Sequence, residues 1–83
     1  MQKARMSLTE EQYQSLPDQG KELHNYLREW NPGLYLKKAK AGNLYQSLMQ
    51  QGEEMQEAMD DLMQQGLDRY QAREIVWEEI YQN

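Results

Sequence analysis

The clearest pattern along the chain is a run of apolar residues at helical spacing between positions 43 and 67. It steps by three and four residues through Tyr45, Leu48, Gly52, Met55, Met59, Leu62 and Gly66. Such a spacing places side chains on one face of an α-helix. Because Gly52 falls in phase with the series, we predict one long amphipathic helix over about residues 44–65, not two helices joined by a turn.

Two shorter helices are predicted in the first thirty residues. Thr9 and Gln12 match a capping box, which begins a helix that Pro17 must end. A second helix follows over about residues 18–30. Its apolar residues step by three and four positions and form a single face, made of Leu23, Tyr26, Leu27 and Trp30.

A third short helix is predicted over about residues 32–41. Asn31 suits the N-cap, and Pro32 suits the first helical position, where its missing N–H costs nothing. Gly42 is placed to end this helix in the left-handed conformation that glycine adopts most easily.

The last helix is predicted over about residues 69–81, after a turn at Gly66 and a cap formed by Asp68 with Gln71. It carries two apolar lines, roughly 120° apart by helical projection. The expected core line is Ala72, Ile75, Val76 and Ile80, and the second line is Tyr70, Trp77 and Tyr81.

These elements and the absence of any strand pattern predict an all-α protein, a compact bundle of four to five helices around the long one. We expect a flexible N-terminal tail over residues 1–8 and one small domain over residues 9–83. The expected core is Leu23, Tyr26, Leu27, Trp30, Leu44, Leu48, Met55, Met59, Leu62, Ile75, Val76 and Ile80. Truncation to alanine should cost about 3–5 kcal/mol at Trp30 and about 2–5 kcal/mol at Leu48.

The composition narrows the class of protein. A chain of 83 residues can build only a thin core, and its mean hydropathy of -1.11 is low for a folded protein. Two Trp and six Tyr nevertheless favour a folded chain. The absence of cysteine excludes disulfides and thiolate metal sites. No apolar run follows the basic residues near the N-terminus, and no run elsewhere could cross a membrane. We therefore expect a cytoplasmic protein without a signal peptide or membrane span.

The net charge of -5 is distributed unevenly. Residues 1–42 carry seven Lys and Arg against five Asp and Glu, whereas residues 43–83 carry two against nine. An acidic half repels nucleic acid and membrane surfaces, and the mildly basic half allows local contact at most.

Few residues suggest chemistry. His24 is the only histidine and has no carboxylate positioned beside it, so we interpret it as a surface residue. The acidic residues of the long helix fit a solvated face better than a calcium loop or a mimic of nucleic acid; they are Glu53, Glu54, Glu57, Asp60 and Asp61. We predict no catalytic residue, cofactor or metal site, and hence no enzyme.

Three sets of residues remain as candidates for binding. Lys37, Lys38 and Lys40 form the one basic patch, which fits a solubilising surface or weak nucleic-acid contact. The methionines of the long helix fit core packing or an adaptable binding face; they are Met49, Met55, Met59 and Met63. The line of Tyr70, Trp77 and Tyr81 is either covered within the fold or exposed as a surface for a partner or a second copy.

Five short motifs also follow one another along the chain: YLRE at 26–29, PGLY at 32–35, GNLYQSL at 42–48, AREIV at 72–76 and EIY at 79–81. In order and spacing they resemble the transposon-encoded TnpV family, small helical proteins of bacterial mobile elements. This chain is shorter than the family pattern and differs at its front end. The resemblance implies a bacterial cytoplasm and a mobile-element setting, and it brings no catalytic residue with it.

The leading hypothesis is a non-enzymatic accessory module of a bacterial mobile element. It would bind a partner protein, or a second copy as a homodimer, through Tyr70, Trp77 and Tyr81. The alternatives are a weak nucleic-acid-binding accessory that uses Lys37, Lys38 and Lys40, and an acidic inhibitor that mimics nucleic acid.

Overall fold

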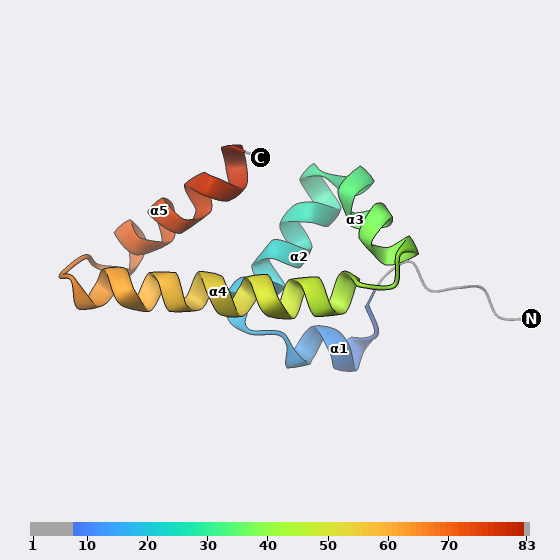
Figure 1. Ribbon diagram of the computed structural model, residues 1–83, viewed down its shortest axis with the longest axis horizontal. Helices are drawn as coiled ribbons and strands as arrows, with labels where there is room; N and C mark the ends of the chain where they lie inside the picture. Colours follow the sequence, from blue (N-terminus) through green and yellow to red (C-terminus); the bar gives the residue numbers. More distant parts are fainter. Residues whose placement is uncertain (1–7, 83) are drawn as a thin grey trace, which may run out of the picture. The chain divides into compact units, whose positions relative to one another are not determined.

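The computed structural model describes residues 8–82 and contains five α-helices, with no strand in that range (Figure 1). They are α1 (Glu10–Ser15), α2 (Asp18–Trp30), α3 (Pro32–Lys40), α4 (Leu44–Gln64) and α5 (Arg69–Gln82). The predicted all-α class is confirmed, and α4 runs unbroken through Gly52. The N-terminal tail predicted over residues 1–8 lies outside the described residues except for Leu8.

Two helices begin with the capping boxes that the sequence predicts. At α1, the backbone N–H of Gln12 donates to Thr9 Oγ1 at 3.1 Å, and the N–H of Thr9 donates to Gln12 Oε1 at 3.1 Å. At α5, the N–H of Gln71 donates to Asp68 Oδ1 at 2.8 Å, and the N–H of Asp68 donates to Gln71 Oε1 at 3.1 Å. Each box satisfies amides that the first turn of a helix leaves without partners.

Two helices end at glycines in the left-handed conformation. Gly42 has a φ of 78° and Gly66 a φ of 107°. The N–H of Asn43 donates to the carbonyl of Lys38, and that of Leu67 donates to the carbonyl of Leu62, each at 3.2 Å. A hydrogen bond from an N–H to the carbonyl five residues earlier is characteristic of the Schellman motif. The predicted ends of α3 and α4 are therefore confirmed to within a residue.

The described chain divides into two compact units, and the boundary falls inside α4 between Glu53 and Glu54. The first unit holds α1, α2, α3 and the beginning of α4, and the second holds the rest of α4 and α5. The single domain over residues 9–83 stays a prediction.

The core of the first unit comes from α2, α3, the beginning of α4 and the turn after α1, whereas α1 itself buries no residue. Its buried hydrophobic side chains are Leu16, Leu23, Leu27, Tyr35, Leu44 and Leu48. Four of these were predicted, and Tyr26 is only half-buried. Trp30 was predicted as core, and this is wrong, because its side chain is 70% exposed. Trp30 is the last residue of α2, beside the turn at Asn31, so the predicted cost of about 3–5 kcal/mol for its truncation does not apply.

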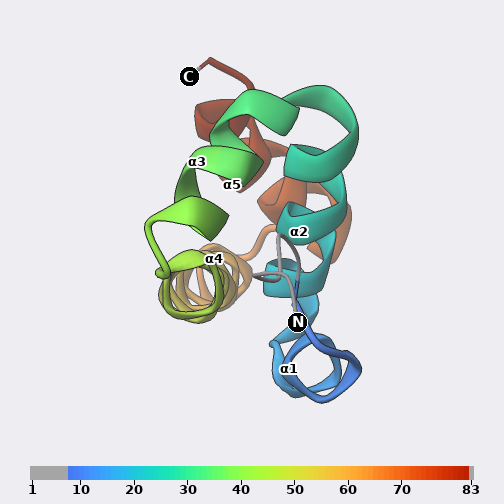
Figure 2. The ribbon, with the colours of Figure 1, turned by 90° about the vertical axis from the view of Figure 1, so that its right-hand side faces the viewer.

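Two glycines bring the backbones of α2 and α4 into contact in the first unit (Figures 1 and 2). A Cβ atom placed on Gly52 would lie 2.7 Å from the Cα of Gly20 and 2.8 Å from Cγ of Pro17. A Cβ atom on Gly20 would lie 3.1 Å from the carbonyl oxygen of Leu48. Glycine at position 52 therefore allows a helix contact that any larger residue would obstruct.

The second unit confirms the predicted core line of α5 at Ala72 and Val76 but buries Trp77 in place of Ile75. Its buried hydrophobic side chains are Met55, Met59, Ala72, Val76 and Trp77. Ile75 was predicted as core, and this is wrong, because it is 44% exposed. Trp77 has much the largest apolar surface on α5, so turning the helix to bury it outweighs the exposure of Ile75. Leu62 and Ile80 are half-buried.

Candidate functional site

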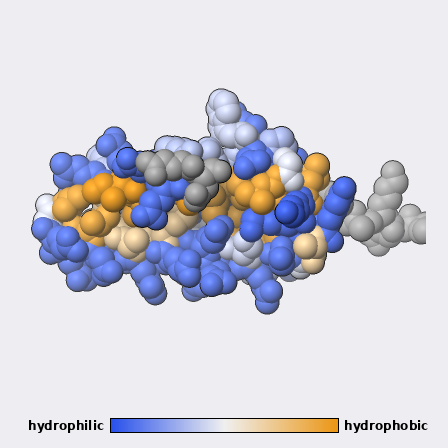
Figure 3. All heavy atoms as spheres, turned by 45° about the horizontal axis from the view of Figure 1, so that its top comes forward, coloured by the Kyte–Doolittle hydropathy of each residue, from blue (hydrophilic) through white to orange (hydrophobic). Residues whose placement is uncertain are grey.

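Several large hydrophobic side chains lie open on the part of the chain that the structure describes. They are Trp30, Leu34, Leu36, Met63, Tyr70, Ile75 and Tyr81. Figure 3 shows hydrophobic residues at the surface among a majority of hydrophilic ones. The predicted Met-rich core is confirmed at Met55 and Met59, whereas Met63 is 42% exposed.

The aromatic line of α5 is divided between the core and the surface. Tyr70 is 80% exposed and Tyr81 is 61% exposed, whereas Trp77 is 3% exposed. Tyr70 and Tyr81 are eleven residues apart, which is three helical turns, so they project in nearly the same direction. Trp77 projects about 20° from Tyr70 and about 40° from Tyr81, toward the buried side. Of the three predicted contact residues, only the tyrosines lie at the surface.

The buried ring of Trp77 packs against Tyr81. Its ring centroid lies 5.8 Å from that of Tyr81, and the guanidinium carbon of Arg73 lies 5.4 Å from the centre of the indole. The first distance is typical of packed aromatic pairs and the second of a cation–π contact. Tyr81 is therefore held against a buried side chain while most of its own surface faces solvent.

Two glutamates complete the exposed side of α5. Glu74 and Glu78 are both exposed, and with Tyr70 and Tyr81 they fall within about 80° of arc on the helix. We call these four residues the tyrosine–glutamate strip. Residues 54–83, which form the second unit, carry two Lys and Arg against eight Asp and Glu, so the strip lies in a strongly acidic setting.

The three lysines do not form one free basic patch. Lys38 is half-buried, and its ammonium donates a hydrogen bond to Ser47 Oγ at 2.9 Å, which ties α3 to the start of α4. Lys37 and Lys40 are exposed. All three lie in the last turn of α3, where positive charge stabilises a helix against its own dipole.

The acidic side chains predicted as a solvated face of the long helix are all exposed, and that prediction is confirmed. Among the described residues, no group of three or more His, Cys, Asp or Glu could hold a metal ion. No helix within residues 8–82 is long and apolar enough to cross a bilayer.

His24 is buried, and its interpretation as a surface residue is wrong. Only 6% of it is exposed. The rings of Tyr13 and Tyr35 meet it edge-on, with centroids 5.1 and 5.3 Å away. Its Nε2 lies 3.0 Å from the hydroxyl of Tyr35, and its Nδ1 lies 3.0 Å from Asn25 Oδ1. Tyr13 and Tyr35 each stand eleven residues from His24, on α1 and α3, so no local spacing indicates that the three rings meet.

Hydrogen bonding orients this histidine. The Nδ2 of Asn25 donates to the hydroxyl of Tyr13 at 3.2 Å, which directs Oδ1 of the same amide toward the imidazole as an acceptor. Nδ1 of His24 then donates, and Nε2 accepts from the Tyr35 hydroxyl in the neutral ring. Because both ring nitrogens are engaged, neither is free to serve as a general base.

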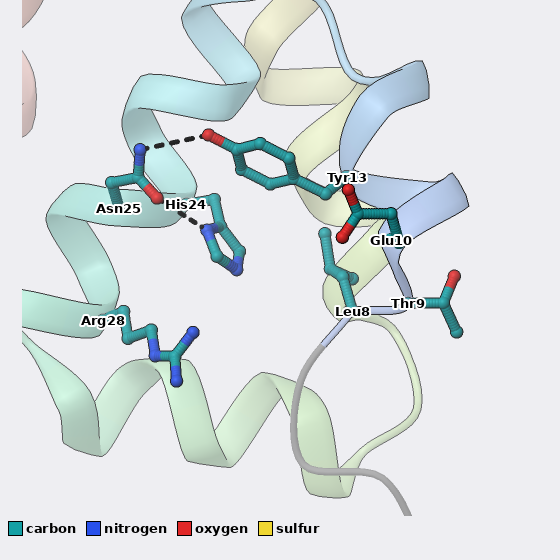
Figure 4. A pocket seen from close by; sticks show the side chains of 7 residues that line it. All are labelled: Leu8, Thr9, Glu10, Tyr13, His24, Asn25 and Arg28. Atoms are coloured by element: carbon teal, nitrogen blue, oxygen red, sulfur yellow. Dashed lines mark hydrogen bonds between the residues drawn. The ribbon is translucent and has the colours of Figure 1, made fainter.

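A pocket of about 270 Å³ opens beside this cluster in the first unit (Figure 4). It is lined by Leu8, Thr9, Glu10, Tyr13, His24, Asn25 and Arg28. Arg28 and Glu10 lie on opposite sides of it, with His24 and Leu8 between them (Figure 4). Opposite charges on the two sides of the pocket favour neither an anionic nor a cationic ligand. We therefore interpret the cluster of Tyr13, His24, Asn25 and Tyr35 as structural.

The burial of Tyr35 makes the free energy of unfolding depend on pH in the alkaline range. Burial raises the pKa of Tyr35 above its ordinary value of 10.0, against the charge of Arg28 and a hydrogen bond with the backbone of Leu8. Above about pH 10 the unfolded chain ionises first, so the free energy of unfolding should fall as the pH rises toward the folded pKa.

Replacing Tyr35 by phenylalanine should make this fall shallower, because the group that resists ionisation in the folded protein is gone. The test is urea denaturation at intervals from about pH 8 to 11. Tyr70→Phe serves as the control, since it removes an exposed phenol. Equal slopes for wild type and Tyr35→Phe would contradict the prediction.

Comparison of the chain with models of protein families, with characterised proteins and with solved structures finds no match.

Proposed function

We propose that the protein is a non-enzymatic interaction module that binds a partner protein through the exposed side of α5. The observation that carries this proposal is the exposure of Tyr70 and Tyr81, at 80% and 61%, on one line of the helix. Tyrosine is a frequent anchor of protein interfaces, because its ring supplies contact area at a low cost in conformational entropy.

The setting that we propose is a bacterial mobile element, and this part rests on the resemblance to the TnpV family. A non-enzymatic role is supported by the two hydrogen bonds of His24, which leave no ring nitrogen free. Nucleic-acid binding through Lys37, Lys38 and Lys40 has less support, because Lys38 is engaged with Ser47.

The test is a double variant, Tyr70→Ser with Tyr81→Ser, which should abolish binding while leaving the helical content unchanged. Sedimentation over a concentration series shows whether the wild type pairs with itself. Capture from a bacterial lysate by tagged protein then measures binding of other proteins. Truncating interface anchors typically costs about 2 kcal/mol or more, so the affinity for a captured partner should fall by about 30-fold or more.

Ile75→Gln is the matched control, because Ile75 is also exposed on α5 but projects about 120–140° away from the tyrosines. It should keep the partners of the wild type. The proposal would be wrong if the double variant and wild type showed the same oligomeric state and captured the same proteins.

A further inference from the structure

We propose that the tyrosine–glutamate strip binds a basic protein segment rich in arginine, an inference that rests on the proposed function and names the partner class. The strip presents Glu74 and Glu78 between Tyr70 and Tyr81, along about 16 Å of helix. Both arginines of α5 project to the other side of Tyr70, by about 60° for Arg73 and about 100° for Arg69. The carboxylates of the strip are therefore not covered by basic side chains of their own helix face.

The negative charge around the strip favours a positively charged partner. Residues 54–83 carry two basic side chains against eight acidic ones. A surface of this kind repels nucleic acid and anionic lipid and attracts cationic groups, with a strength that falls as salt is added.

The aromatic rings select arginine over lysine. A guanidinium pairs with a carboxylate through two parallel hydrogen bonds and also stacks on aromatic faces, whereas an ammonium is a compact, strongly hydrated charge. The same helix already holds one such contact, since Arg73 lies 5.4 Å from the centre of the Trp77 ring. Two glutamates flanked by two tyrosines on one face thus match both properties of an arginine side chain.

A second copy of the chain is a poor occupant of the strip. Two strips facing each other would bring four glutamates together. Residues 1–53 carry seven basic against six acidic side chains, so the charge of the first unit is nearly balanced and attracts the strip only weakly. The proposed partner is therefore a different protein.

Fluorescently labelled octa-arginine and octa-lysine peptides test the proposal by anisotropy at about 50 and 200 mM salt. We expect octa-arginine to bind the wild type at least about fivefold more tightly than octa-lysine, and Tyr70→Ser with Tyr81→Ser to remove that preference. Glu74→Gln with Glu78→Gln should weaken octa-arginine binding by about tenfold or more at the lower salt.

The matched control is Glu57→Gln with Asp61→Asn, which removes two exposed charges with the same spacing from α4. It should change octa-arginine binding by less than about threefold. An equal loss in this control, equal binding of the two peptides, or preferential binding of duplex DNA would each overturn the inference. If the peptides fail while the tyrosine variant still loses its partners from lysate, the interaction module stands and only the arginine assignment is wrong.

Discussion

Gly52→Ala should destabilise the protein by about 1–3 kcal/mol, although the same change in a helix normally stabilises by up to about 1 kcal/mol. The physical reason is the contact between α2 and α4. The added methyl would lie 2.7 Å from both the Cα and the backbone nitrogen of Gly20. Backbone atoms of a helix do not rotate aside as a flexible side chain does, so the two helices must separate and the packing around them loosens.

The measurement is urea denaturation followed by circular dichroism, with Gly33→Ala as control. Gly33 lies in α3, and a Cβ there would meet no atom within 4 Å. That substitution should therefore be neutral or stabilising. A higher midpoint for Gly52→Ala than for wild type would mean that α2 and α4 do not touch at this position.

Leu48→Ala should cost about 2–5 kcal/mol. The Leu48 side chain is completely buried in the first unit, and its backbone lies at the closely packed crossing of α2 and α4, which has little freedom to fill the cavity. A chain of this size is typically stable by only about 4–12 kcal/mol, so the variant should lose a large fraction of its stability.

Leu34→Ala is the matched control for Leu48→Ala, because it is the same substitution at an exposed position. The same atoms are deleted from a side chain that is 38% exposed, so the cost should be below about 1 kcal/mol. Thermal and urea midpoints of both variants give the comparison. If the two variants melted together, Leu48 would not be a core residue.

Helix ends were predictable from the sequence because their causes are local. Thr9 with Gln12 and Asp68 with Gln71 satisfy amides three residues apart, and Gly42 and Gly66 supply a conformation that other residues avoid. The spacing through Gly52 likewise predicted one continuous helix, although it did not reveal that a glycine is needed there. That need depends on Pro17 and Gly20, which are more than thirty residues away in the chain.

The errors concern which side of a helix is covered and, at Trp30, how far along the helix the cover extends; both are properties of the whole fold. His24 looked like a surface residue because its hydrogen-bonding partner Tyr35 and its neighbour Tyr13 belong to other helices. On α5, the two apolar lines competed, and the spacing could not show that Trp77 would be buried and Ile75 exposed. The candidate site was therefore only partly predictable: its tyrosines were identified, but Glu74 and Glu78 beside them were not, nor was the division of the aromatic line between core and surface.

The opposite surroundings of Trp30 and Trp77 give the chain two separate optical reporters. Trp30 is 70% exposed, so its emission should be red-shifted and open to iodide, whereas Trp77 is 3% exposed and shielded from such a quencher. With Trp30 replaced by phenylalanine, all tryptophan light comes from α5. Tyr81 lies against Trp77 and is part of the exposed strip. A ligand that binds the strip should therefore change the emission wavelength or the fluorescence lifetime of Trp77, without any attached dye.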